Sequence, residues 1–206
     1  MVRQRKIRQF FNFYEELAND SQFLYVLFVD LCNSTEYKHY LLKTGMSDII
    51  WMHRQLFFLN KVCIHAEKAN GKIVKTMGDA VLATFDFSES AEDILHSCVD
   101  LVAAFSKPII FTGKDKIDIK VSIDYGEARN GAIFSNEFDP IGLCVDRCAR
   151  LGSETAPGEI TFSQDFDKQL RIDDKTAIHP RIDSILELHS SFKGVGEINY
   201  YKLTIR

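Results

Sequence analysis

The sequence predicts an α+β fold with the element order βαββαβ, and three observations lead to this prediction. Two short apolar runs, at residues 72–76 and 80–85, flank a tight Met-Gly-Asp turn and indicate a hairpin of buried strands. Stretches with apolar residues at helical spacing lie on either side of that hairpin along the chain. Two more apolar strands, at 23–30 and 117–125, enclose these helices in the sequence.

The first strand, at 23–30, is followed by an Asn-Ser-Thr run at 33–35, whose residue types favour the N-terminus of a helix. A long helical stretch is expected at 35–70, and Gly45 is a point at which it can break. An Asn-Gly pair ends this stretch and leads into the hairpin at 72–85.

A second helix is expected at 88–105, where Pro108 stops it. The strand at 117–125 is followed by a turn or bulge at 126–131, which leads into residues 132–134. The remaining elements are a helix at 141–152, a short strand at 160–162 and a closing pair of strands at 186–188 and 198–203.

The 206 residues show one composition throughout and suffice for a sizeable core. We therefore expect one domain at 23–206, with a ferredoxin-like βαββαβ core, helices on one face of the sheet and C-terminal additions. A separate segment at 1–22 is basic at its start and aromatic behind. Such a segment suits an anionic membrane surface or a partner, but we favour a helix that packs on the domain.

Charge and composition argue against several classes of protein. The net charge of −4 disfavours binding of nucleic acid through phosphate contacts. The sequence has neither an apolar run near the ~20 residues that cross a bilayer nor the apolar stretch of a signal peptide. Five cysteines without a regular pairing pattern indicate a reduced protein. We therefore expect a cytoplasmic location and no membrane association, and we interpret Cys144 and Cys148 as small buried side chains rather than zinc ligands.

Two carboxylates stand at the ends of buried strands, since Asp30 ends the first strand and Asp79 opens the second strand of the hairpin. Charged groups in apolar surroundings are costly unless a metal, a ligand or a partner compensates them. The pair therefore predicts a site for divalent cations. The helix that starts just behind Asp30 offers free backbone N–H groups, which suit a phosphate.

Five separated blocks of the chain resemble the catalytic domain of the class III nucleotidyl cyclases, over residues 23 to 206. Each block alone is a weak match, but five blocks in the order of the family are specific. They are 28–35, which resembles the first metal-aspartate motif; 75–79 with Phe85, which resembles the second; Gly126 and Gly131, which match the glycines after the fourth strand; 139–150, which matches the base- and phosphate-binding helix; and 192–197, which resembles the closing Lys-Gly segment.

The resemblance implies that a nucleoside triphosphate is cyclised to its 3′,5′-cyclic monophosphate with release of pyrophosphate. It implies that Asp30 and Asp79 hold two divalent cations, Mg²⁺ or Mn²⁺, and that Arg150 stabilises charge on the phosphates. It also implies a head-to-tail homodimer with two shared sites, in which a monomer is inactive. The other residues that it assigns are the ribose-binding position Asp146 and the phosphate-binding positions Asn33, Ser34, Thr35 and Lys193.

Lys75 and Asp139 stand where adenylate cyclases read adenine. A lysine donates to a ring nitrogen and an aspartate accepts from an exocyclic amine, so this pair fits adenine or cytosine, disfavours guanine and fits uracil poorly. Asp124 and Tyr125 replace smaller or neutral residues of the family. A tyrosine that narrows the pocket favours the smaller pyrimidine ring, so Tyr125 is a candidate base-binding residue.

Asp146 departs from the family, which has asparagine at this position, because a carboxylate adds negative charge near the substrate and cannot donate while ionised. The preferred interpretation is a minimal cyclase similar to the pyrimidine cyclases of bacterial anti-phage signalling, the Pycsar systems, which make cyclic CMP or cyclic UMP. One alternative is an adenylate cyclase that makes cyclic AMP. Another is a degenerate homologue that binds a nucleotide without turnover.

Overall fold

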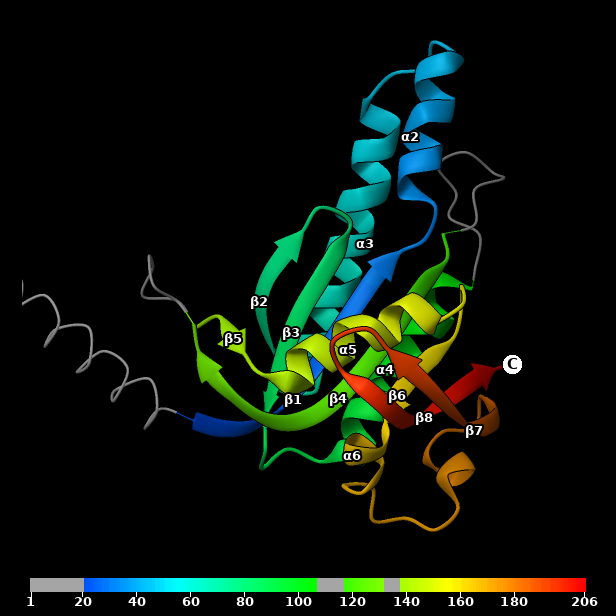
Figure 1. Cartoon of the computed structure of the whole chain (residues 1–206). Helices are drawn as coiled ribbons and strands as arrows, with labels where there is room; N and C mark the ends of the chain where they lie inside the picture. The colour runs from blue at the N-terminus through cyan, green and yellow to red at the C-terminus, as the bar shows by residue number, and fades with distance from the viewer. Residues whose placement is uncertain (1–20, 107–116, 132–137) are drawn as a thin grey trace, which may run out of the picture.

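The computed structural model describes residues 21–106, 117–131 and 138–206, which form one mixed sheet with helices on both faces (Figure 1). The strands of these residues are β1 (Ser21–Leu31), β2 (Lys72–Met77), β3 (Ala80–Asp86), β4 (Ile119–Asn130), β5 (Pro140–Ile141), β6 (Ile160–Ser163), β7 (Ile182–Phe192) and β8 (Gly196–Ile205). The helices are α2 (Ser34–Lys43), α3 (Ile49–Lys68), α4 (Ala91–Phe105), α5 (Leu143–Glu154) and α6 (Gln164–Asp167), with a 3₁₀ helix, η1 (Lys175–Ile178).

The sheet order is β2-β3-β1-β4-β6-β8-β7, and β5 pairs with β4. Its first half, in which β1 lies antiparallel between β3 and β4, is the ferredoxin-like arrangement. Beyond β4 the sheet continues through β6, which runs parallel to β4, and through the β7–β8 hairpin. The predicted α+β core with C-terminal additions is therefore confirmed.

Strand β1 carries apolar side chains on both of its faces, and this divides the core in two. Tyr25, Leu27 and Val29 belong to the cluster that includes residues of α3 and α4. Leu24 and Val26 belong to the cluster that includes residues of α5. A strand that is apolar on both faces needs cover on both faces. The expectation of helices on one face only is therefore wrong, because α5 covers the second face.

The long helical stretch after β1 is two helices, and the predicted break is confirmed. Helix α2 ends at Lys43, α3 begins at Ile49, and Gly45 lies between them with φ 67°, in the left-handed region that favours glycine. Figure 1 shows this helical pair extending beyond the end of β1. In the part of the chain that the structure describes, every helix is too short or too polar to cross a membrane.

Strand β4 differs from the prediction, because it runs through Gly126 to Asn130 where a turn or bulge was expected. The glycine serves a close approach instead, since a Cβ at Gly126 would lie 2.9 Å from the Cβ of Cys144 on α5. Residues 132–134, which were expected to follow the turn, lie outside the described residues.

The ends of the domain also differ in detail. Strand β1 begins at Ser21, and the helix expected at 1–22 otherwise lies outside the described residues. The closing strands β7 and β8 are longer than predicted, because their hairpin pairs residues from Ile182 to Ile205. Helix α4 begins at Ala91, where the Ser90 hydroxyl oxygen accepts from the Asp93 N–H at 3.1 Å and caps it.

Candidate active site

A pocket of about 380 Å³ lies where β1, the β2–β3 turn and the N-terminus of α2 meet. The pairing of β1 with β3 builds it, because Asp30 is opposite Ala80 and therefore next to Asp79. The Leu31 N–H also donates to the Asp79 carbonyl oxygen at 3.0 Å. The pocket is lined by Asp30, Leu31, Cys32, Asn33, Ser34, Thr35, Glu36, Asp79, Lys120, Thr155 and Pro157.

The structure thus brings together both predicted metal ligands and three predicted phosphate-binding positions, Asn33, Ser34 and Thr35. Asn33 has φ 56°, and this left-handed residue turns the chain from β1 into α2. The N-terminus of the ten-residue helix α2 therefore opens onto the pocket beside Asp30. A helix N-terminus carries backbone N–H groups and a partial positive charge, which suit a phosphate.

The donor atoms of the pocket fit a divalent cation. Asp79 accepts from the Ser34 hydroxyl, so its side-chain partner among the described residues is a neutral group. Asp30 lies 3.1 Å from the ammonium of Lys120, and among the described residues this is the one cation paired with either carboxylate. Burial raises the pKa of the Cys32 thiol to about 11, so oxygen atoms are the ligands that the pocket offers near pH 7. Carboxylate and hydroxyl oxygens are the ligands that Mg²⁺ and Mn²⁺ prefer.

Lys120 is a pocket residue that the sequence reasoning missed. It lies on β4, opposite Asp30 in the β1–β4 register, so the two side chains share one face of the sheet. The sequence gives little signal for it, because Lys120 falls on the polar register of an alternating strand together with Asp118, Ser122 and Asp124.

Lys75 and Asp139, the predicted base-reading residues, are in direct contact. The Lys75 ammonium donates to both carboxylate oxygens of Asp139 at 2.7 Å, although the residues are 64 positions apart. Both side chains are 42% exposed, so a ligand can reach them. Neither residue lines the pocket that contains Asp30 and Asp79, which we call the carboxylate pocket.

Asp146 and Arg150 lie on α5 and are exposed. They are four residues apart and therefore neighbours on one side of the helix. Lys193 is exposed in the turn between β7 and β8. None of these three predicted residues lines the carboxylate pocket of the same chain. The structure therefore separates the predicted site residues into those that line the pocket and those that do not. The first group is Asp30, Asn33, Ser34, Thr35 and Asp79; the second includes Lys75, Asp139, Asp146, Arg150 and Lys193.

Tyr125 is not placed with the base-reading residues. Its ring lies 4.8 Å from that of Tyr25 and 5.8 Å from that of Phe23, between ring centroids, and it packs on the core cluster of α3 and α4. Lys75 lies opposite Leu82, which belongs to the cluster of α5. Because paired residues point to the same face, Tyr125 and Lys75 lie on opposite faces of the sheet.

Cys144 and Cys148 are buried on α5 against the sheet. The Cys148 thiol lies 3.4 Å from the carbonyl oxygen of Val26 and 3.3 Å from that of Ser122. Burial raises the pKa of the Cys144 thiol to about 11. Both cysteines act as small side chains that let the helix approach the sheet closely.

His96, Asp100 and His179 form a separate cluster on α4 and the segment after η1, with ligand atoms within 4.8 Å of one another. The hydrogen bonds disfavour a metal there. The Arg181 N–H donates to Nδ1 of His179, so the neutral ring carries its proton on Nε2, which lies 3.1 Å from Asp100. A metal ligand needs a free lone pair at that nitrogen.

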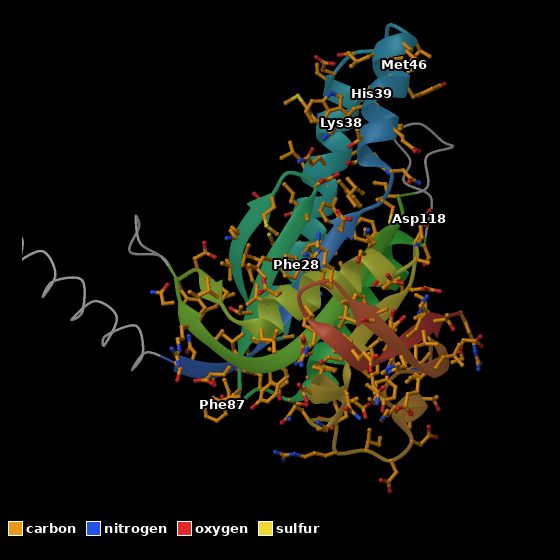
Figure 2. All side chains as sticks on the ribbon, viewed as in Figure 1. Phe28, Lys38, His39, Met46, Phe87 and Asp118 are labelled. Carbon is orange, nitrogen blue, oxygen red and sulfur yellow. The ribbon has the colours of Figure 1, made fainter. Side chains whose placement is uncertain are left out.

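Figure 2 places Asp118 at the base of α2, close to the pocket end of β4. The Cys32 N–H donates to the Asp118 carbonyl oxygen at 2.9 Å and so ties the start of the pocket loop to β4. The same view shows Lys38, His39 and Met46 on the outer part of the α2–α3 pair, away from this base.

Comparison with known proteins identifies the fold and the family. The solved structures that this chain resembles include the guanylyl cyclase Cya2, with a TM-score of 0.75, 18% identity and coverage of 91% of this chain and 94% of the other. They also include the guanylate cyclase domain of RhGC from Catenaria anguillulae in complex with GTP, with a TM-score of 0.71, 19% identity and coverage of 90% and 97%. A third is the adenylyl cyclase CyaB from P. aeruginosa, with a TM-score of 0.67, 19% identity and coverage of 90% and 95%.

The comparison with curated proteins found no match. The family model described as the adenylate and guanylate cyclase catalytic domain matches residues 18–204, which is nearly the whole chain. The family resemblance of the five sequence blocks is therefore confirmed, and the chain belongs to the family of adenylate and guanylate cyclase catalytic domains, the class III nucleotidyl cyclases.

Proposed function

We propose that this chain cyclises a nucleoside triphosphate to its 3′,5′-cyclic monophosphate and pyrophosphate, with Asp30 and Asp79 as ligands of two divalent cations. The observation that carries the proposal is the pocket that joins these two carboxylates to the N-terminus of α2. When bound, Mg²⁺ or Mn²⁺ favours loss of the proton of the ribose 3′-hydroxyl and neutralises the triphosphate.

The residues around the pocket have separate tasks. Ser34 donates to Asp79 and holds its carboxylate in place. Backbone N–H groups at Asn33, Ser34 and Thr35 bind phosphate oxygens, and the Lys120 ammonium adds positive charge at the same place. Arg150 and Lys193 stabilise charge on the phosphates, and Asp146 accepts a hydrogen bond from the ribose.

We further propose that the site is completed by a second copy of the chain. The support is the separation of the residues, because Asp146, Arg150 and Lys193 are exposed and do not line the carboxylate pocket of their own chain. A homodimer with two shared sites brings the pocket of one copy to α5 of the other. A two-fold axis makes two equivalent sites from one such contact.

For the base, we propose adenine or cytosine. The ion pair of Lys75 and Asp139 opens to give a donor and an acceptor side by side, which matches a ring nitrogen beside an exocyclic amine. Tyr125 packs on the other face of the sheet, so it supplies no steric argument for a pyrimidine. Cyclic CMP synthesis in anti-phage signalling is the more specific version of this proposal, and cyclic AMP synthesis is the alternative.

The test is pyrophosphate release with Mn²⁺ by Asp30→Ala and Asp79→Ala. We expect each change to lower turnover by roughly a hundredfold or more while the fold survives, because each removes a metal ligand. Asp183→Ala is the matched control, since Asp183 is an exposed aspartate that pairs only with Arg206 among the described residues. Substantial activity in Asp30→Ala or Asp79→Ala would contradict the assignment of these residues as metal ligands.

A degenerate homologue gives a different result in the same assay. The carboxylate at Asp146 favours it, because the family has asparagine there. Such a protein is stabilised by nucleotide, which shows as a higher melting temperature, yet releases no pyrophosphate.

A further inference from the structure

The first two turns of helix α5 pack on the sheet through small groups, whereas Leu151, near its C-terminal end, is buried with Phe192 and Tyr200. The Cβ of Cys144 stands so close to Gly126 that any side chain there would collide with it, and Gly152 likewise stands close to Ser122. Cys148 contacts the backbone of β1 and β4. These contacts bring the helix close, but small groups interlock little, so over residues 143–148 they define the rotation of the helix about its own axis only weakly.

A buried ion pair lies beside this contact between the small side chains of α5 and the sheet. Arg147 of α5 donates from Nε to Oδ2 of Asp124 at 2.5 Å and from Nη2 to Oδ1 at 2.7 Å. The Asp124 side chain is 0% exposed and that of Arg147 is 14% exposed. Arg147 also donates to the carbonyl oxygen of Tyr125 at 3.2 Å. Two parallel hydrogen bonds from a planar guanidinium fix direction as well as distance.

The surroundings hold both partners in position. The Ser163 hydroxyl and the Tyr125 N–H donate to Oδ1 of Asp124, at 2.5 Å and 2.7 Å. Asp165 of α6 lies 2.7 Å from Nη2 of Arg147. Burial raises the pKa of Asp124, while the hydrogen bonds from Arg147 oppose that rise. Separation of the pair would leave a buried charge without its partner, so the geometry is strongly held.

The place of Arg147 in α5 connects this pair to the proposed chemistry. It directly follows Asp146 and precedes Arg150 by three residues, and each position turns the helix by about 100°. We propose that the ion pair of Asp124 and Arg147 sets the rotation of α5 and thereby aims Asp146 and Arg150 at the substrate, an inference that rests on the proposed function. Arg147 is then a positioning residue, since its guanidinium is occupied by β4 and α6.

The experiment replaces both charges and keeps the neutral hydrogen bonds. Asp124→Asn with Arg147→Met leaves an acceptor for Ser163 and removes both charges of the buried pair, while Asp165, which loses Arg147, keeps its contact with Lys168 at 2.9 Å. The matched control is Asp183→Asn with Arg206→Met, which makes the same two changes in an exposed ion pair at the β7–β8 edge. Melting temperature, kcat, KM and amide hydrogen exchange are measured for both double variants and for the parent.

We expect the Asp124→Asn/Arg147→Met protein to melt within a few degrees of the parent. Its kcat should fall on the order of a hundredfold, because misplacement by about 1 Å has that effect on catalysis. KM should change by less than about threefold, because the aim of Asp146 and Arg150 matters most in the transition state. Amide exchange in 143–150 should accelerate by about tenfold or more without nucleotide, since a weakly held helix opens more often.

The exchange measurement separates this inference from the proposed function. Unchanged exchange at 143–150 overturns the inference whatever the activity, and so does a parental kcat in the double variant. A third outcome is that the parent makes no cyclic nucleotide while exchange accelerates only in the Asp124→Asn/Arg147→Met protein. In that case the proposed function is wrong, but the ion pair is still shown to fix the position of α5.

Discussion

Each carboxylate of the pocket has a neighbour that governs its chemistry. Asp79 accepts from the Ser34 hydroxyl, a neutral group that orients the carboxylate without competing for its charge. Asp30 is paired with Lys120 at 3.1 Å, and both side chains are partly exposed. The ammonium lowers the cost of bringing two carboxylates together, but it also competes with a cation for Asp30.

Lys120→Met is expected to raise the affinity of the nucleotide-free protein for Mn²⁺ by roughly fivefold, because it removes an ion pair of about 1 kcal/mol from Asp30. Binding of free Mn²⁺, followed by electron paramagnetic resonance, measures this directly. Lys202→Met is the control, since Lys202 pairs with Glu159 at 3.2 Å outside the pocket. Equal or weaker Mn²⁺ binding in Lys120→Met would show that the ammonium does not compete for Asp30.

Asp146→Asn is expected to keep activity or to raise the use of ATP. The change removes a negative charge near the triphosphate and supplies an amide that donates as well as accepts. Rates with ATP and with CTP are compared before and after the change. Loss of activity on every base would mean that the carboxylate performs a task that the asparagine of the family does not.

At the scale of elements, β4 and α5 carry most of the residues on which the proposed chemistry of this chain depends. β4 supplies Lys120 to the pocket and Asp124 to the buried ion pair, and α5 supplies Asp146, Arg147 and Arg150. Their close approach requires glycine at 126. A small change at this contact should therefore reach the site through α5.

Gly126→Ala tests this contact. The new Cβ would stand 2.9 Å from the Cβ of Cys144, so α5 must move away from β4. We expect a loss of about 1–3 kcal/mol of stability, seen as a melting temperature lower by about 2–4 °C per kcal/mol, and reduced turnover.

Cys144→Gly in the same chain removes the atom that the new methyl group meets. Activity should return, although a helical glycine itself lowers stability by about 1 kcal/mol. Cys144→Gly alone is the control for that effect. If turnover stays low in the double variant, Gly126 matters for a reason other than its distance from α5.

At the scale of the whole molecule, the proposed site is divided between two copies, and mixing of variants tests this. Asp30→Ala and Arg150→Ala should each be inactive as homodimers. A mixed dimer has one site with both changes and one intact site, so an equimolar mixture should recover up to about a quarter of the parent rate. No recovery, with mixed dimers shown by native mass spectrometry, would place Asp30 and Arg150 in the same site of one chain.

The sequence predicted the core well where the pattern is local. Apolar runs located β1, β2 and β3, and the Met-Gly-Asp turn between β2 and β3 placed Asp79 just before β3. Local patterns therefore located Asp30, Asp79 and the start of α2, and the long-range pairing of β1 with β3 joins them into one site.

Long-range pairing explains what the sequence could not predict. Whether β4 turns or continues at Gly126 depends on the approach of α5. The pairs Lys120–Asp30 and Arg147–Asp124 join residues 90 and 23 positions apart, which no local pattern reveals. Alternation in a strand tells which residues share a face, but only tertiary contacts tell what lies on that face.

The most direct test of the account is a competition among the four nucleotides. The protein is incubated with Mn²⁺ and equimolar ATP, GTP, CTP and UTP, and the cyclic products are identified by mass spectrometry, with Asp30→Ala as the blank. We predict that cyclic CMP or cyclic AMP dominates and is absent from the blank. No cyclic product from any nucleotide, while nucleotide still raises the melting temperature, would contradict the cyclase activity, and a dominant cyclic GMP or cyclic UMP would contradict the role of Lys75 and Asp139.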